Sequence, residues 1–514
     1  MSESTAPRAY GNWTRPKSAG VVGLGFTGTV ILMGSMLVLT FMMMAGQILM
    51  ALAVLTGSVL LLAMLITRDA SGRTMLGRTI TKAGWWQAKS AKTHLYRSGP
   101  LGRTGWGTCQ LPGVAARTSL SEWRDSLGRP FALVEARAAG TYTIVFASEP
   151  EGSSLVDQEQ IDAWVAQWGH WLSSLTNEPG LESASVTIET APDSGARLRR
   201  ELRQNVDMNA PAFAKAAMED IELQYPSGGA SIRAYVALTY AATPKTAGRR
   251  RKPEDMARFL APRVATLSSG LSATGAGAAH PVAAEELCEI VRVAYDPAAA
   301  PLIEDAHGLG EPTGLTWSDA GPAASQASWS NLRHDSALSV SWMMTEAPQS
   351  PIRAQTLLRL LTPSAVIPRK RVTFLYRPID RGRAAKIVHN DVRDASFNLT
   401  SAQSQRADDA LQLRKARATE EEEAAGAALL QFGILITATV TEEQARAARA
   451  EGERGFDFLE AQAESLVEEG SLAGHLQIRR VWGSQDAAFA AALPIGVNLR
   501  RHLRMPAELR DQVA

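Results

Sequence analysis

The sequence predicts a membrane α-helical hairpin followed by an α+β cytoplasmic region with ferredoxin-like strand–helix–strand layers. Two observations lead to this fold class. Residues 21–67 contain no Asp, Glu, Lys or Arg, whereas the remainder of the chain mixes short strand patterns with amphipathic helix patterns. The chain has 514 residues and a net charge of +1, so the protein as a whole is not a strongly charged polyelectrolyte binder.

The uncharged run is long enough for two membrane crossings. A transmembrane helix needs about 20 apolar residues, and apolar density falls at Ala45-Gly46-Gln47, where glycine permits a turn. We therefore expect helices over residues 22–43 and 47–66. A cleaved signal peptide is disfavoured because its apolar core would span only about 7–15 residues. A buried core hairpin is disfavoured by the complete lack of charge.

Basic residues flank the run on both sides. Arg8, Arg15 and Lys17 precede it, and the stretch from residue 68 to residue 103 is also predominantly basic. Since basic flanks remain cytoplasmic, the sequence predicts a multi-pass protein of the cell membrane with both termini in the cytoplasm. The same flanks predict a contact with anionic lipid headgroups.

Composition divides the chain into six segments. They are a cytoplasmic N-terminal segment (1–20), the two-helix transmembrane hairpin (21–67), a basic membrane-proximal linker (68–108), an α+β subdomain (109–270), a Gly/Ala/Pro-rich insertion or loops (271–331) and a second α+β subdomain (332–514). Within the last segment, residues 398–430 are expected to form one long helix with its acidic run, Glu420–Glu423, facing solvent.

The first α+β subdomain opens with two predicted strands, Phe131–Val134 and Thr141–Phe146, separated by a turn. Trp164, Trp168 and Trp171 then recur at helical spacing. A ligand platform is one interpretation of these tryptophans, but core packing of an amphipathic helix is the better one. Alternation from residue 232 to residue 240 predicts a further strand with one buried face.

The second α+β subdomain repeats the same kind of unit. Its predicted elements are a strand at 338–343, a helix at 354–361, strands at 372–376 and 434–440, a helix capped by Thr441 and Gln444, and a strand at 476–481. Recurring strand–helix–strand units indicate ferredoxin-like layers.

Motifs for common chemistry are missing from the sequence. There is no Gly-Lys dipeptide for a phosphate-binding loop, no His-Glu pair of a zinc protease and no Gly-x-Ser-x-Gly elbow. Cys109 and Cys288 are the only cysteines, which is typical of a reducing compartment and excludes a cysteine-based zinc finger. We therefore expect no enzyme activity, cofactor or metal. The basic runs Arg249–Lys252 and Arg369–Arg371 are interpreted as solvated loops rather than nucleic-acid contacts.

Two stretches carry a resemblance to secretion proteins. Residues 10–16, Tyr-Gly-Asn-Trp-Thr-Arg-Pro, followed by the apolar run, resemble the start of actinobacterial integral membrane proteins of conjugation-type gene clusters. The C-terminal part is similar to the end of the non-catalytic N-terminal domain of type IV secretion ATPases. The residues concerned are the strand Phe432–Val440, the helix from Thr441, the strand Leu476–Trp482 and the closing helix Ala487–Pro494.

This resemblance implies a split arrangement. In the ATPase family such an ending leads into a motor domain with its phosphate loop, and that loop is missing here. We therefore expect an inner-membrane anchor and docking scaffold of a type IV secretion or conjugation-like machine. Its expected partners are a separate motor ATPase, other membrane subunits and further copies of itself within the complex.

The expected partner-binding site is the C-terminal tail, because it lies where the chain would have entered the motor. Its residues are Leu499, Arg500, Arg501, Leu503 and Arg504. The alternative for this tail is a frayed basic terminus. Two other functions stay open: an EccE-like core subunit of a type VII secretion system, and a membrane-bound enzyme of unknown type.

Overall fold

The structure is a computed structural model of the chain. It describes residues 9–11, 13, 25–67, 74–99, 102, 108–150, 152, 156–193, 195, 200–202, 204–207, 209–224, 229–243, 248–348, 352–364, 366–401 and 407–502. These residues form a helical N-terminal region and a large α+β body.

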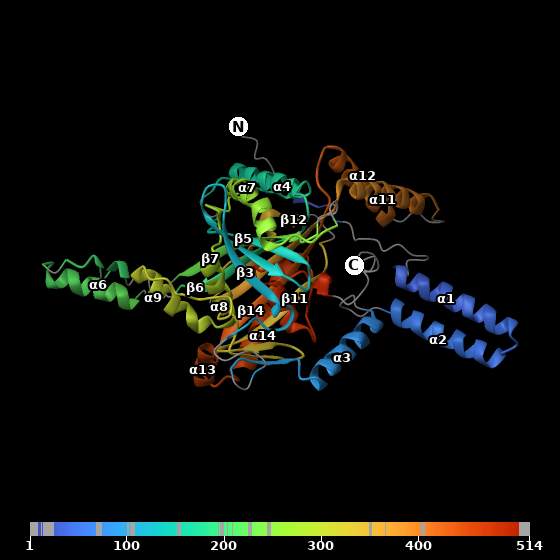
Figure 1. The fold of residues 1–514 in the computed structure, drawn as a ribbon, viewed down its shortest axis with the longest axis horizontal. Coiled ribbons are helices and arrows are strands. Elements are labelled where there is room, and N and C mark those ends of the chain that lie inside the picture. Colours follow the sequence, from blue (N-terminus) through green and yellow to red (C-terminus); the bar gives the residue numbers. More distant parts are fainter. Residues whose placement is uncertain are drawn as a thin grey trace.

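Two apolar helices, α1 (Gly25–Met44) and α2 (Ile48–Ile66), are joined by a tight turn in which Gly46 has a φ of 73°. They lie side by side and project away from the body (Figure 1). Their large apolar side chains are mostly exposed, as is Leu49 at 85%. Both helices are uncharged and present apolar surface that the body does not cover.

The prediction of a multi-pass membrane protein with both termini in the cytoplasm is wrong. Among the described residues, α2 alone is long and apolar enough to cross a membrane. The apolar part of α1 extends only from Gly28 to Met44. Gly28–Met44 is shorter than the roughly 20 residues that a typical span needs, so among the described residues the long apolar run contains one candidate span.

The helix α3 (Met75–Ser90) connects α2 to the body, where a basic linker was expected. The hydroxyl of Thr74 caps it by accepting from the Gly77 N–H at 3.1 Å. The Trp85 ring packs against the Trp329 ring at 6.0 Å, whereas Trp86 is exposed. Thus α3 is anchored to the body by one face.

A 13-stranded sheet forms the body, and every described strand pair in it is antiparallel. Its strands are β2 (Leu95–Arg97), β3 (Thr118–Arg124), β4 (Pro130–Ala136), β5 (Thr141–Ser148), β6 (Leu181–Pro192), β7 (Ala230–Ala241), β8 (His280–Pro281), β9 (Ala324–Ala327), β10 (Leu332–His334), β11 (Ala337–Glu346), β13 (Arg369–Pro378), β14 (Leu430–Thr441) and β15 (Gln477–Arg480). A separate two-stranded sheet pairs β1 (Ala9–Tyr10) with β12 (Ile352–Arg353).

The helices of the body connect these strands. They are α4 (Gln158–Leu175), α6 (Ala212–Gln224), α7 (Pro253–Ser272), α8 (Ala284–Tyr295), α9 (Ala300–Leu309), α10 (Leu358–Leu361), α11 (Arg381–Ser401), α12 (Ala407–Ala424), α13 (Glu442–Ala450), α14 (Phe456–Ala473) and α15 (Gln485–Ala491). The segment 271–331, expected to be an insertion or loops, therefore contains α8 and α9.

The sheet contains the same arrangement twice. Neighbouring strands run in the order β8-β5-β7-β6 in the first half and β15-β11-β14-β13 in the second. Along the chain, each half consists of two successive strand–helix–strand units, such as β5-α4-β6 and β7-α7-β8 in the first half. The halves meet where β6 pairs with β13 antiparallel. The strand order across the sheet is thus palindromic, because the second half repeats the order of the first half in reverse. An approximate two-fold axis perpendicular to the sheet would produce this order.

The two faces of the sheet differ in character. On one face, apolar strand residues such as Leu238 and Ile436 pack against α4, α7 and α14. Trp171 is buried there and stacks on Trp168 at 5.1 Å, which confirms the core-packing interpretation of the tryptophans. On the other face, α8 and α15 cover strands that also carry buried Thr, Ser, Arg and Glu side chains. A buried face with polar and charged side chains is less usual than a buried apolar face.

Each half inserts a helical arm between its second and third strands. The first arm contains α6, and the second contains α11 and α12. Because β6 and β13 are antiparallel, the two arms leave from opposite ends of the sheet. Figure 1 shows α6 on one side of the body and α11–α12 on the other, the side on which α1 and α2 also lie.

The prediction of one long helix over residues 398–430 does not match the second arm. There α11 ends at Ser401, α12 begins at Ala407 and ends at Ala424, and β14 begins at Leu430. The acidic run Glu420–Glu423 lies in the last turn of α12. A predominantly polar composition without glycine or proline continues through residues 398–424, which hides the break between the two helices from a periodicity argument.

Candidate functional site

The junction between the two halves buries a cluster of charged side chains. The register places Glu189 of β6 opposite Arg371 of β13 on one side and Arg233 of β7 on the other. Arg371 Nη2 and Arg369 Nη1 each donate to Glu189 Oε1 at 2.9 Å. Glu189, Arg369 and Arg371 are all buried. The predicted solvated loop at Arg369–Arg371 is therefore wrong, because these residues begin a central strand.

Burial and charge act against each other in this cluster. Burial by itself would raise the pKa of Glu189, but Arg371 and Arg369 outweigh it and hold this pKa below its usual value. Burial lowers the pKa of Arg369, and Glu189 opposes that effect. The Arg371 Nη1 atom is buried without a hydrogen-bond partner in the part of the chain that the structure describes. With two buried guanidinium groups and one buried carboxylate, the cluster holds more buried positive than negative charge.

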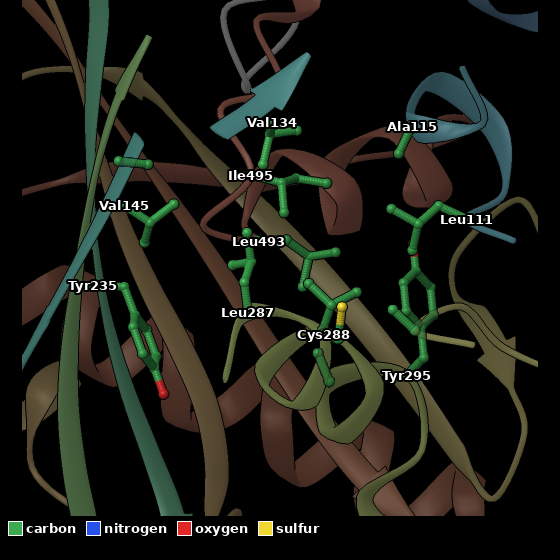
Figure 2. Packing of buried hydrophobic residues seen from close by; sticks show 14 of the residues in the cluster. Leu111, Ala115, Val134, Val145, Tyr235, Leu287, Cys288, Tyr295, Leu493 and Ile495 are labelled. Atoms are coloured by element: carbon green, nitrogen blue, oxygen red, sulfur yellow. The ribbon is translucent and has the colours of Figure 1, made fainter. Parts of the chain in front are cut away.

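The C-terminal segment runs across this junction. The hydroxyl oxygens of Thr187 (β6) and Thr373 (β13) lie 3.0 Å apart, and each is 3.4 Å from the Ala492 carbonyl oxygen, which accepts from them. Leu493 and Ile495 are buried as well. In Figure 2 both side chains lie among Val134 of the sheet and residues of α8. This segment therefore contacts both halves and is part of their shared core.

Gly496 continues the segment in a conformation that suits glycine. Its φ is 69°, and a Cβ atom at this position would lie 2.1 Å from Thr143 Oγ1 and 2.4 Å from Thr239 Oγ1. Contacts this short do not occur between real atoms, so a larger residue would have to displace the segment from the sheet.

Three residues of the predicted partner-binding tail come together on a short 3₁₀ turn, Leu499–His502. Arg501 Nε donates to Glu182 Oε2 at 2.9 Å, and a second contact joins Nη2 to Oε1. The Leu499 side chain is 38% exposed. Leu503 and Arg504 lie outside the described residues. The described tail is thus folded against the start of β6, with Leu499 partly exposed.

A buried histidine lies near the same face. His334 Nδ1 donates to the Tyr295 carbonyl at 2.5 Å, and Nε2 accepts from the Ser339 hydroxyl at 2.7 Å, which sets the neutral tautomer. Burial, with Arg371 nearby, lowers the pKa of His334 to about 4. Both ring nitrogens have hydrogen-bond partners within the protein, so this histidine is a structural element of the core. Within the described ranges, no group of three or more His, Cys, Asp or Glu side chains is placed to hold a metal ion.

Sequence reasoning did not identify Glu189, His334 or Arg371 as members of one cluster. One signal was available: Arg369 and Arg371 alternate in phase with Thr373, so the strand predicted from residue 372 could have been extended backwards. The partner strand and its register could not be inferred, because Glu189 is far away in the sequence.

Comparison with known proteins adds one finding at the N-terminus. A family described as a domain of unknown function, DUF8461, matches residues 17–77. No curated protein matches the chain. The matched residues include α1, α2 and the first turn of α3, so the chain is similar to that family over its apolar N-terminal region and not over the α+β body.

Proposed function

We propose that this protein is an anchor and docking scaffold of a type IV secretion or conjugation-like machine, and that it recruits a separate motor ATPase. In this proposal α2 is the membrane anchor, the α+β body is the docking module, and other membrane subunits and further copies of the chain complete the assembly. Anionic lipid would contact the basic residues of α3, where Lys82 and Lys89 accompany the exposed Trp86.

The observation that carries the proposal is the grouping of exposed elements at one end of the sheet. The α11–α12 arm leaves from the end of β13, and the tail residue Arg501 is paired with Glu182 at the adjacent start of β6. The exposed apolar helix α2 lies on the same side of the body (Figure 1). An anchor, a projecting arm and a partly exposed tail on one side suit a protein that presents a partner to a membrane.

We further propose that each half is a ferredoxin-like unit, as the secretion-ATPase resemblance implies. The repeated strand order supports this proposal, since the third strand of each half lies between its first and second strands. A docking module separated from its motor lacks the high effective concentration that a covalent linkage supplies. We therefore expect an interface of standard size or larger, about 1,600 Å² in total.

The test is co-purification of the full-length chain from membranes of its source cells in a mild detergent, followed by identification of the proteins bound to it. We expect a motor ATPase in stoichiometric amount. Removing residues 503–514 together with Leu499→Asp should weaken recovery of the ATPase. These changes leave the buried segment up to Gly496 intact, so the loss could be assigned to the tail. A truncation from residue 495 would be uninformative, because Ile495 is only 1% exposed.

A matched control is Leu309→Asp, which changes an exposed leucine on α9 at the far side of the body. Recovery of the ATPase should be unchanged in this variant. Absence of any ATPase from the full-length preparation would contradict the recruitment proposal. Recovery of type VII core subunits instead would favour the EccE-like alternative.

A further inference from the structure

A basic hollow lies where β7 connects to α7. Its volume is about 540 Å³, and five cations and two carboxylates line it. The lining residues are Arg249, Arg250, Arg251, Lys252, Glu254, Asp255 and Arg258. This hollow is separate from the buried junction and from the C-terminal tail.

The second half of the molecule shows that the fold does not require a loop between the strand and the helix at this position. There the equivalent connection has no intervening residue: β14 ends at Thr441 and α13 begins at Glu442. Thr441 and Gln444 cap that helix reciprocally. In the first half, residues 242–252 are interposed between β7 and α7. Four consecutive cations in a connection that its counterpart omits indicate a role other than joining the two elements.

The basic loop is held in place by its own backbone and by two of its side chains. The Arg251 N–H donates to the Ala242 carbonyl at 2.8 Å, and the Arg251 carbonyl accepts from the Tyr142 hydroxyl at 3.0 Å. Arg250 Nη2 lies 3.0 Å from Glu135 Oε1. The Arg251 guanidinium lies 4.1 Å from the centre of the Phe259 ring. The hollow is therefore a pre-formed feature.

Two other cations have no such structural task. Within the described part of the chain, the Arg249 and Lys252 side chains form no ion pair or hydrogen bond. Lys252 is also the N-cap residue of α7 and provides no side-chain cap, so the N–H groups of the first turn lack a side-chain acceptor. Arg258 lies 4.0 Å from Asp255, a long and exposed contact.

We propose that this hollow binds a phosphate group. Guanidinium and ammonium donors match the oxygens of a phosphate, and the amino end of a 20-residue helix adds a favourable dipole. The two carboxylates of the first turn leave an excess of positive charge, which suits a compact dianion such as a phosphate monoester. That group can belong to a lipid headgroup or to a soluble phosphate. The proposal does not depend on recruitment of an ATPase.

The test measures binding by the full-length chain in detergent and in phosphatidylcholine nanodiscs. Equilibrium dialysis with pyrophosphate examines a soluble ligand, and nanodiscs with added phosphatidic acid, observed by ³¹P NMR, examine a lipid headgroup. The variant is R249A/K252A, which removes the two unpaired cations. The control is R381A/R383A, which makes the same change in charge on the exposed start of α11.

We expect R249A/K252A to weaken binding at least tenfold in one of the two arms, and R381A/R383A to leave binding unchanged. Binding of pyrophosphate would identify a soluble phosphate as the ligand, and binding of phosphatidic acid alone would identify a lipid headgroup. Equal binding by R249A/K252A and the unmodified protein would overturn the proposal, as would absence of binding in both arms.

Discussion

Arg371 of β13 and Glu189 of β6 form a buried ion pair, with Nη2 and Oε1 2.9 Å apart, across the strand pair that joins the two halves of the sheet. Arg369 shares the same carboxylate oxygen. Like the apolar residues of the same strands, these ion pairs specify one strand register, because a shift of one residue would move the side chains of one strand to the other face of the sheet.

Removing the carboxylate should therefore be costly. Glu189→Ala leaves two buried guanidinium groups without their anion and should lower the free energy of unfolding by about 3–5 kcal/mol. Glu469→Ala, which removes the exposed partner of Arg359, should cost less than about 1 kcal/mol. Chemical unfolding followed by tryptophan fluorescence measures both values. If the two variants lost equal stability, the cluster would not hold the junction together.

A second expectation concerns replacement of the whole cluster. Replacing Glu189 by leucine and both Arg369 and Arg371 by methionine removes the three buried charges and leaves apolar groups in their place. Such replacements of buried ionic groups are often neutral or stabilising. The triple variant should therefore unfold at a higher denaturant concentration than Glu189→Ala alone, in the same fluorescence experiment. A triple variant less stable than the single one would show that the charges themselves are required.

The buried histidine predicts a pH dependence of stability. The pKa of His334 is lowered from 6.5 to about 4, so between these values the unfolded chain binds a proton that the folded chain does not. Stability should therefore fall as the pH decreases from about 6.5 to about 4, with a contribution of roughly 3 kcal/mol from this group.

His334→Gln should reduce this slope in the same pH window, whatever its effect on stability at neutral pH. His389→Gln is the control, because the His389 side chain is exposed. Unfolding midpoints measured from pH 4 to pH 7.5 give both slopes. An unchanged slope in His334→Gln would mean that another group accounts for the loss.

The C-terminal segment should be sensitive to a single methyl group. Gly496→Ala places a Cβ atom against Thr143 and Thr239 at a positive φ, and should cost at least about 2 kcal/mol. Gly310→Ala has a similar φ of 72° but meets open space, so its cost should be about 1 kcal/mol or less. Thermal melts compare the two variants. Equal losses would show that the close approach to the sheet has no energetic role.

The one candidate span among the described residues, α2, predicts which apolar helix retains the protein in membranes. Leu60→Arg, near the middle of α2, should oppose insertion by about 2.5–3.5 kcal/mol and shift the chain from the membrane fraction to the soluble fraction. Leu309→Arg on α9 should leave the distribution unchanged. Carbonate extraction followed by immunoblotting measures the distribution. Complete retention of Leu60→Arg in membranes would require another anchor.

The sequence by itself determined the presence of an uncharged apolar region and of an α+β body, together with several strands and helices. The strands at Phe131–Val134 and Thr141–Phe146 and the helix containing Trp171 are all present. Local signals sufficed here because apolar periodicity reflects which face of an element is buried. The expectation that the tail binds a partner came from sequence position and charge, whereas the ion pair of Arg501 with Glu182 was found only in the structure.

Only the tertiary structure decided how these elements combine. The pairing of β6 with β13, the palindromic strand order and the burial of Arg369 and Arg371 depend on contacts between residues far apart in the chain. A run of three basic residues resembles a solvated loop until a partner strand supplies a carboxylate such as Glu189. Likewise, the number of candidate spans depends on where helices begin and end, because each span needs enough apolar length of its own, whatever the total length of the apolar run.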